Sequence, residues 1–231
     1  MEVNLKNACI QVISKNSEKY SKVCSLIENV FSDAFDARIK RTPGLILAIE
    51  ETSDLNTTDV CAAMILNTNW ENQFFSEQYF EGNIETLVSA WINSPVKRTE
   101  IVEIGGLASD GARKAAQQLI AEAPWFLMGM GYRYALVTIT AQVRFLFNKT
   151  GIIYKHLCVA REECLPESHR AIWGRYYEQK PETCVVDLFA SHLNLMQQRH
   201  SRRSIESLVM KIVSNSSEKI SLAARTILET A

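Results

Sequence analysis

Apolar and polar positions follow two different periods along the chain, and each period predicts one kind of element. Alternation at every second position is typical of strands, whereas apolar residues three and four apart form one face of a helix. Strands are predicted over residues 8–14, 45–49, 60–66, 99–104, 134–140, 152–160 and 185–190. Helices are predicted over residues 20–31, 84–92, 112–123 and 141–149, with two more after residue 204. This mixed order of strands and helices indicates an α/β or α+β domain.

Local signals place several element ends in the middle of the chain. Gly151 follows a helical pattern, and glycine suits the left-handed position at which helices often end. Ser109 or Asp110 can cap the helix that begins after them, because their side chains accept free backbone N–H groups. Pro124 lacks the N–H that a helix interior needs, so we expect a break before residues 125–130.

The C-terminal tail is predicted to be helical. Asn215 and Glu218 are three residues apart, as in a capping box, and predict the start of the last helix. We therefore expect one domain over residues 1–192, followed by a helical extension over residues 193–231 that packs on the same domain.

Composition narrows the classes of function. The 231 residues are 47% hydrophobic, which is ample for a sizeable core. The formal net charge of −1 gives no support to nucleic-acid binding, which normally needs a basic excess. The first residues do not resemble a secretory signal, and no apolar run approaches the roughly 18–20 residues that cross a bilayer. We expect a cytoplasmic protein that does not insert into membranes.

The six cysteines contain no Cys-x-x-Cys pair, and most have apolar neighbours, so buried free thiols are expected. His156, Cys158, Cys164 and His169 suggest a zinc site as an alternative. The five residues between the two cysteines are not a familiar ligand spacing, so no metal is predicted.

Gly105-Gly106 stands between a predicted strand and the best predicted helix. Glycines let a backbone approach a ligand closely, and a helix start presents unpaired N–H groups and a positive dipole end. This arrangement suits a pyrophosphate or phosphopantetheine arm. A tight strand–helix turn without a ligand is the alternative interpretation.

Several motifs, in order, resemble the thermostable haemolysin family. Residues 101–108 (Ile-Val-Glu-Ile-Gly-Gly-Leu-Ala) resemble its Val-Glu-x-Gly-Asn-Leu-Ala element, and Trp173-Gly174-x-Tyr176-Tyr177 is the most specific piece. The other pieces are residues 75–80 with 84–85, and residues 138–147. The resemblance covers residues 31–186 and not the tail beyond His192.

The resemblance implies a GNAT-like mixed sheet flanked by helices, similar to autoinducer synthases, and an acyltransferase activity. In such folds the fourth strand and the next helix hold a thioester donor, either acyl-CoA or an acylated phosphopantetheine. The resemblance implies donor binding by Gly105, Gly106, Leu107, Ala108, Ser109, Gly111 and Ala112. Backbone N–H groups of Leu107 or Ala108 would polarise the thioester carbonyl.

The resemblance also implies that Glu103 is a catalytic residue, because it falls near the glutamate that acyl-homoserine-lactone synthases have on the same strand. A carboxylate beside an amine can orient it or take its proton. On this interpretation Glu103→Gln would leave the fold intact and lower turnover about 100-fold. The chain departs from the family at Gly106, where asparagine is usual, and at residues 64–67, so a changed acceptor or lost activity is an alternative.

Further candidates come from the polar and aromatic residues before this strand. Glu77 and Glu85 are further candidate catalytic residues that would flank a substrate amine, or alternatively are solvated carboxylates on a surface helix. Trp70, Phe75, Tyr79 and Arg98 are the expected substrate-binding residues. The aromatic residues line an acyl channel or alternatively pack in the core; they are Trp70, Phe74, Phe75, Tyr79, Phe80 and Trp91.

The leading hypothesis is acyl transfer from acyl-CoA or an acyl carrier protein to a small amine, with no tightly bound cofactor. Residues 199–203 form a basic cluster that could dock an acidic carrier protein, or alternatively is a solvated linker. The alternatives are a membrane-active cytolysin and a non-catalytic module that binds acyl groups or carrier proteins.

Overall fold

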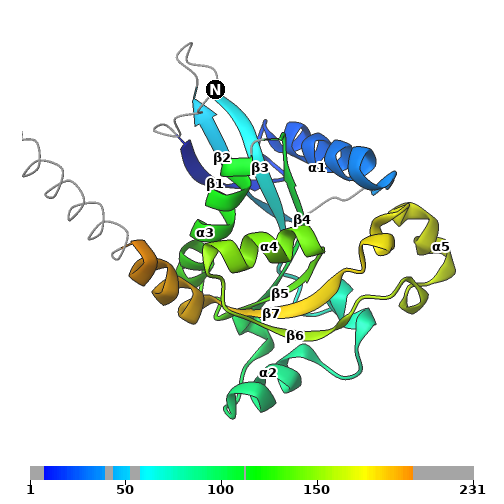
Figure 1. Cartoon of the computed structure of the whole chain (residues 1–231), viewed down its shortest axis with the longest axis vertical. Coiled ribbons are helices and arrows are strands. Elements are labelled where there is room, and N and C mark those ends of the chain that lie inside the picture. Colours follow the sequence, from blue (N-terminus) through cyan, green and yellow to red (C-terminus); the bar gives the residue numbers. More distant parts are fainter. Residues whose placement is uncertain (1–7, 40–43, 53–57, 112, 200–231) are drawn as a thin grey trace, which may run out of the picture. The chain divides into compact units, whose positions relative to one another are not determined.

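The computed structural model describes residues 8–39, 44–52, 58–111 and 113–199. The chain divides into two compact units, residues 1–192 and 193–231. The first unit holds every strand and helix labelled in Figure 1. The helices predicted after residue 204 and residues 200–203 of the basic cluster lie outside the described residues.

The first unit is built on a mixed sheet of seven strands in the order β1-β2-β3-β4-β5-β7-β6. Its strands are β1 (Ala8–Ser14), β2 (Leu45–Thr52), β3 (Thr58–Asn67), β4 (Ile101–Ser109), β5 (Tyr134–Ile139), β6 (Tyr154–Val159) and β7 (Glu182–Asp187). Neighbouring strands are antiparallel except β4 and β5, which run parallel. The expected mixed sheet flanked by helices is confirmed.

The α-helices of this unit are α1 (Tyr20–Phe35), α2 (Ile84–Ile92), α3 (Arg113–Gly129), α4 (Ala141–Thr150) and α5 (Glu167–Arg170). Short 3-10 turns are η1 (Phe75–Tyr79), η2 (Arg98–Glu100), η3 (Glu162–Cys164), η4 (Ala171–Trp173) and η5 (Tyr176–Gln179). A further helix begins at residue 188.

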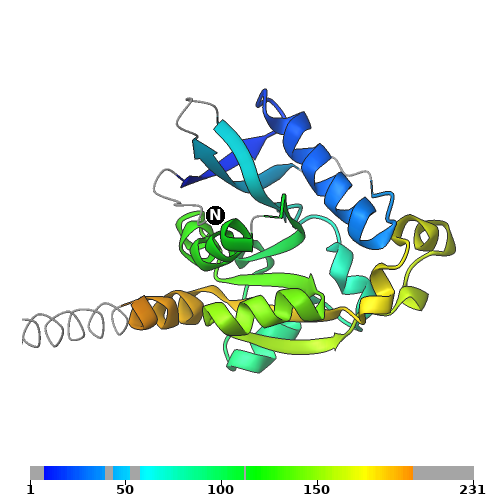
Figure 2. The ribbon, with the colours of Figure 1, turned by 45° about the horizontal axis from the view of Figure 1, so that its top comes forward.

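Helices cover both faces of the sheet. Side chains of a strand alternate between its faces, so Ile46 and Leu47 of β2 point in opposite directions, and both are fully buried. Ile46 packs in one core cluster with Val23 and Ile27 of α1. Figure 2 shows α1 on one side of the strands and α3 with α4 on the other. A second cluster places Ile84 and other residues of α2 against β4 and β5.

The predicted break at Pro124 is wrong, because α3 runs through it from Arg113 to Gly129. A proline inside a helix costs about 3 kcal/mol through its missing N–H and its ring. Leu119 and Ile120 before it and Leu127 after it are all buried. Burial of each such side chain stabilises by about 1.5–3 kcal/mol, so packing outweighs the break. The predicted helix end at Gly151 is confirmed, since its N–H donates to the Phe147 carbonyl oxygen at 2.9 Å.

All six cysteines are free, as expected, but their predicted burial holds only in part. Cys61 and Cys184 are buried, whereas Cys9 and Cys164 are exposed, because they lie on an edge strand and in a surface turn. Burial raises the pKa of the Cys184 thiol to about 12 and that of Cys61 to about 11. These two thiols are therefore poor nucleophiles at neutral pH.

Candidate active site between strands β4 and β5

Gly105 and Gly106 lie inside β4, and the expected turn from strand to helix at this pair is wrong. The strand continues because it pairs with β3 as far as Ser109, with a shift in register between Ala63 and Ile65. Gly106 has φ of +59°, and a Cβ there would lie 2.8 Å from Cδ1 of Ile65. The two glycines therefore form an irregularity in the strand, as glycines often do where another side chain approaches the backbone.

Strands β4 and β5 separate after their first four residue pairs. Ile101 to Ile104 pair with Tyr134 to Val137, and no further pairs follow although both strands continue. The edge of β4 from Gly105 onward is therefore not paired with β5. Backbone groups at such an edge can hydrogen-bond an extended ligand that carries amide groups.

A cavity of about 140 Å³ lies at this separation. Its lining comes from helices on both faces of the sheet, with Phe31 of α1 on one side and Ile120 of α3 and Val143 of α4 on the other. Such a lining is possible because β4 and β5 no longer close the sheet there. The lining is mostly apolar, and an apolar cavity of this size is comparable with cavities that bind benzene-sized molecules.

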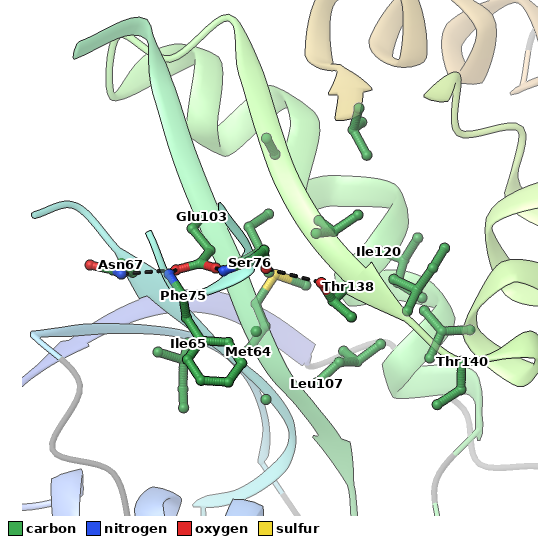
Figure 3. Close-up of a pocket in the computed structure, with 18 of the residues that line it drawn as sticks. Met64, Ile65, Asn67, Phe75, Ser76, Glu103, Leu107, Ile120, Thr138 and Thr140 are labelled. Carbon is green, nitrogen blue, oxygen red and sulfur yellow. Dashed lines mark hydrogen bonds between the residues drawn. The ribbon is translucent and has the colours of Figure 1, made fainter. Parts of the chain in front are cut away.

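Glu103 is the one charged side chain among the described residues that line the cavity, and it is 5% exposed. Its Oε1 accepts the backbone N–H of Ser76 at 2.7 Å. Its Oε2 accepts the backbone N–H of Phe75 at 3.0 Å and the side-chain amide of Asn67 at 2.9 Å. Figure 3 shows the carboxylate held between these groups. Oε1 accepts only one of these three hydrogen bonds, so it can accept a second hydrogen bond from a ligand.

Two hydroxyl groups line the cavity next to Glu103. Thr138 Oγ1 on β5 lies 2.9 Å from Ser76 Oγ. A dashed line in Figure 3 marks this hydrogen bond. Thr138 Oγ1 also lies 3.0 Å from Oγ1 of Thr183, which is fully buried on β7. The polar part of the cavity therefore combines one carboxylate with a chain of hydroxyls.

Aromatic rings line the side of the cavity that faces α1. These rings belong to Phe31, Phe35, Phe75, Tyr79, Trp173 and Tyr176, and neighbouring centroids are 5.2–6.0 Å apart. Gly174 brings this wall together, because a Cβ on it would lie 2.3 Å from the Phe35 carbonyl oxygen. The next residue, Arg175, donates its N–H to that same oxygen at 2.7 Å. The Trp-Gly-x-Tyr-Tyr motif thus builds part of the site.

The model of one protein family, described as thermostable hemolysin, matches residues 13–192. The chain belongs to the thermostable hemolysin family. This confirms the resemblance that the motifs carry. A comparison with curated proteins finds no significant match.

The fold of this hemolysin-family chain is similar to those of two solved synthases. The AHL synthase LasI has 11% sequence identity and a TM-score of 0.50, and the match covers 79% of this chain and 90% of LasI. FeeM, an N-acyl amino acid synthase from uncultured soil microbes, has 8% identity and a TM-score of 0.51. That match covers 84% of this chain and 98% of FeeM. At these identities the likeness shows the fold, and it confirms the expected GNAT-like architecture.

Glu77 and Glu85 of this hemolysin-family protein do not line the cavity but bind Arg98. Glu77 Oε2 lies 2.6 Å from Nη2 of Arg98, and Glu85 Oε2 lies 2.9 Å from Nη1. Glu77 is 2% exposed, so the alternative of a solvated carboxylate is wrong for this residue. Burial raises its pKa, but hydrogen bonds from Arg98 and from the N–H groups of Ile84 and Phe74 outweigh burial and leave the pKa below its ordinary value.

Arg98 uses its remaining donors on the backbone. Its Nε donates to the Trp70 carbonyl oxygen at 3.1 Å and its Nη2 to that of Asn72 at 2.9 Å, and the guanidinium stacks on Phe74. Trp70 is 38% exposed and donates Nε1–H to the Ile101 carbonyl oxygen. Neither Arg98 nor Trp70 lines the cavity, so this cluster holds the segment that precedes η1 in place. Phe75 and Tyr79, from the same predicted set, do line the cavity.

The expected donor-binding segment is divided by the structure. Gly105, Gly106 and Leu107 line the cavity. Ala108 is buried and pairs with Ala63 of β3, and Ser109 ends the strand instead of capping a helix. Gly111 lies in the bend that follows, and Ala112 lies outside the described residues.

Asn67, Ser76 and Thr138 were not expected at the site. Asn67 faces Glu103 directly across β3 and β4, and this pairing is not encoded in any local pattern. Among the described residues, no group of three or more His, Cys, Asp or Glu side chains could hold a metal ion. In the same part of the chain no helix has the length and apolar character needed to cross a membrane.

Proposed function

We propose that this protein is an acyltransferase that moves an acyl group from a thioester, acyl-CoA or an acylated carrier protein, to a small amine. The observation that carries this proposal is the apolar cavity between the separated strands, with the Glu103 carboxylate in its wall. Two proteins that share the fold are named as an AHL synthase and an N-acyl amino acid synthase, which supports the same class of reaction.

The donor arm would lie along the edge of β4 that β5 leaves unpaired. Its amide groups would pair with the backbone from Gly105 onward, and its acyl chain would enter the apolar part of the cavity. Leu107 lines the cavity and Ala108 pairs with β3, so of these two residues Leu107 is the one whose backbone would contact the donor arm. The proposal requires no resident cofactor.

The acceptor would lie between Glu103 and the aromatic wall. Oε1 has room for one more donor, which the attacking amine would supply. Glu103 would then orient the amine and accept its proton as the nitrogen attacks. Aromatic faces favour an amine with an apolar or cationic body.

The test measures free thiol released from a series of acyl-CoA thioesters of increasing chain length, with and without a panel of amines. Mass spectrometry of the amide product verifies the transfer. We expect saturable thermal stabilisation by acyl-CoA and release that depends on the amine. Binding without transfer to any amine would favour a non-catalytic acyl-binding module.

Acylated carrier protein is tested in parallel as the donor. Failure of both donors to bind would contradict the proposal. Liposome leakage that is independent of thioester would instead favour a cytolysin.

A further inference from the structure

The hydroxyls of Thr183, Thr138 and Ser76 form a chain whose hydrogen-bond direction follows from the geometry. Thr138 Oγ1 donates to Ser76 Oγ at 2.9 Å. A hydroxyl has one proton, so Thr138 has none left for Thr183 and must accept from it at 3.0 Å. The chain therefore runs from Thr183 on β7, through Thr138 on β5, to Ser76 in η1.

Ser76 is the last hydroxyl of this chain, and its own proton is not donated to the other two hydroxyls. Its Oγ accepts from Thr138, and no hydrogen bond donated by this oxygen to another described residue is found. Ser76 is 3% exposed, yet it lines the cavity. A buried hydroxyl normally finds an acceptor, because an unpaired polar group costs free energy when removed from water. Water can accept this proton while the cavity holds no ligand, and a ligand that displaces the water has to supply the acceptor instead.

The position of Ser76 relative to Glu103 defines which ligand atom this is. The backbone N–H of Ser76 donates to Glu103 Oε1 at 2.7 Å, and only the Cα and Cβ atoms separate that nitrogen from Oγ. The hydroxyl and the carboxylate therefore lie within a few atoms of each other. An amine bound to Oε1 would attack a carbonyl carbon beside Ser76, and the oxygen on that carbon would then lie within reach of Oγ.

We infer that the Ser76 hydroxyl donates a hydrogen bond to the carbonyl oxygen of the bound acyl thioester and is a catalytic residue of the transfer. Thr138 is a positioning residue, because its donated hydrogen bond leaves Ser76 free to donate only into the cavity. The inference rests on the proposed function, since it requires a thioester in this cavity.

The hydroxyl would act as the bonds change. The nitrogen lone pair forms the C–N bond while the carbonyl π pair moves onto oxygen, and Ser76 stabilises the negative charge that develops there. The pair then returns, the C–S bond breaks, and sulfur leaves as a thiolate with its electron pair. Glu103 takes the proton from nitrogen and an equivalent proton reaches the thiolate, which gives an amide and a free thiol.

The experiment compares two unreactive donor analogues that differ in the carbonyl. One is a CoA ketone, with a methylene between sulfur and the carbonyl carbon, and the other is an S-alkyl-CoA of equal length without a carbonyl. Calorimetry measures their dissociation constants for the wild type and for Ser76→Ala. We expect the variant to bind the ketone about 3- to 10-fold more weakly and the thioether unchanged.

Two further variants separate the hydroxyl's contact from a structural role. Thr150→Val removes a hydroxyl that bonds to helix backbone outside the cavity, and it should change neither dissociation constant. Ser76→Cys keeps a weak donor and should fall between Ser76→Ala and the wild type. In turnover, Ser76→Ala should lower kcat about 100-fold and raise the KM for the donor by no more than the factor by which it weakens binding of the ketone.

Equal weakening of both analogues by Ser76→Ala, or no effect on either, would overturn the inference. Failure of the wild type to bind either analogue, together with failure to bind acylated carrier protein, would instead count against the proposed function. The two failures are therefore distinct.

Discussion

Ser76 donates its backbone N–H to Oε1 of Glu103 at 2.7 Å, across 27 residues of sequence. Phe75 donates its own N–H to the other oxygen, so one carboxylate binds two consecutive peptide groups of η1. Glu103 therefore joins β4 to η1 in addition to facing the cavity. Any substitution of this side chain tests a structural contact and a chemical one together.

The structure changes the expectation for Glu103→Gln. The NH2 group of a glutamine side chain would replace one of the two carboxylate oxygens, and both oxygens now accept hydrogen bonds. The NH2 group would therefore face another donor, either the N–H of Ser76 or the N–H groups of Phe75 and Asn67. We expect the variant to lose about 1–3 kcal/mol of stability in urea unfolding, besides losing about 100-fold in turnover. This expected loss of stability replaces the prediction from sequence that Glu103→Gln leaves the fold intact.

Asn67→Ala is the matched variant for that measurement. It removes one donor and keeps the carboxylate and both backbone bonds. We expect a smaller loss of stability and retained transfer. A Glu103→Gln protein as stable as the wild type would show that the contacts with η1 contribute little, and unchanged turnover would remove Glu103 from the mechanism.

Gly174 is predicted to tolerate no side chain. Its φ of +52° disfavours other residues, and an added Cβ would lie 2.3 Å from the Phe35 carbonyl oxygen. Strain and overpacking together predict that Gly174→Ala lowers the free energy of unfolding by about 3–5 kcal/mol. Gly82→Ala is the control, because Gly82 also has positive φ but nothing within 4 Å of the added Cβ. That variant should lose about 1–2 kcal/mol, and similar losses in the two would contradict the argument from the contact.

Much of the fold could be predicted because the signals were local. The helix expected over residues 84–92 and the strand over residues 8–14 have these bounds in the structure. In each segment, the spacing of apolar residues that predicts the element and the residues that mark its ends are close together in sequence. Pro124 and Gly105-Gly106 were misinterpreted because packing by α3 and pairing with β3 override the local preference of these residues.

The candidate site was predictable only in part. Glu103 was found through a family motif, but its partners Asn67 and Ser76 are 36 and 27 residues away in sequence. Which residues meet across the sheet depends on strand register, and the sequence patterns do not specify it. Arg98 was predicted to bind substrate, but its guanidinium N–H groups donate to Glu77 and Glu85 instead. The sequence does not show that these three residues meet in the fold.

Arg98 is predicted to stabilise the fold by neutralising a buried carboxylate. Glu77 has a side-chain exposure of 1%, so Arg98→Met would leave its charge buried and unpaired. We expect a loss of about 3–5 kcal/mol at neutral pH. Arg133→Met is the control, because its ion pair with Glu100 is more exposed, at 50% and 25%, and should contribute about 0–1 kcal/mol.

The pH dependence of this pair has a definite sign. The folded-state pKa of Glu77 is lowered from its ordinary value of 4.5, so its contribution is complete above pH 4.5 and is lost as the pH falls through the lower folded value. The wild type should therefore lose stability in acid, while Arg98→Met should lose less because its isolated Glu77 favours the neutral form. Urea unfolding at neutral and acid pH measures the free energy of unfolding of both proteins. A difference between the two free energies that does not change with pH would contradict this role of Arg98.

The apolar end of the cavity is predicted to set the length of the acyl chain. Val143 on α4 lines the cavity from the face opposite α1, and Val143→Phe would occupy space that a long chain needs. The longest accepted chains should lose about 10-fold or more in kcat/KM, and acetyl transfer should change little. Phe145→Ala is the control, because Phe145 lies on the same helix, is 65% exposed and does not line the cavity. It should leave the chain-length profile unchanged. If Val143→Phe lowered transfer of all chain lengths equally, the acyl chain would have to lie elsewhere, and the assignment of this end of the cavity to the acyl group would be wrong.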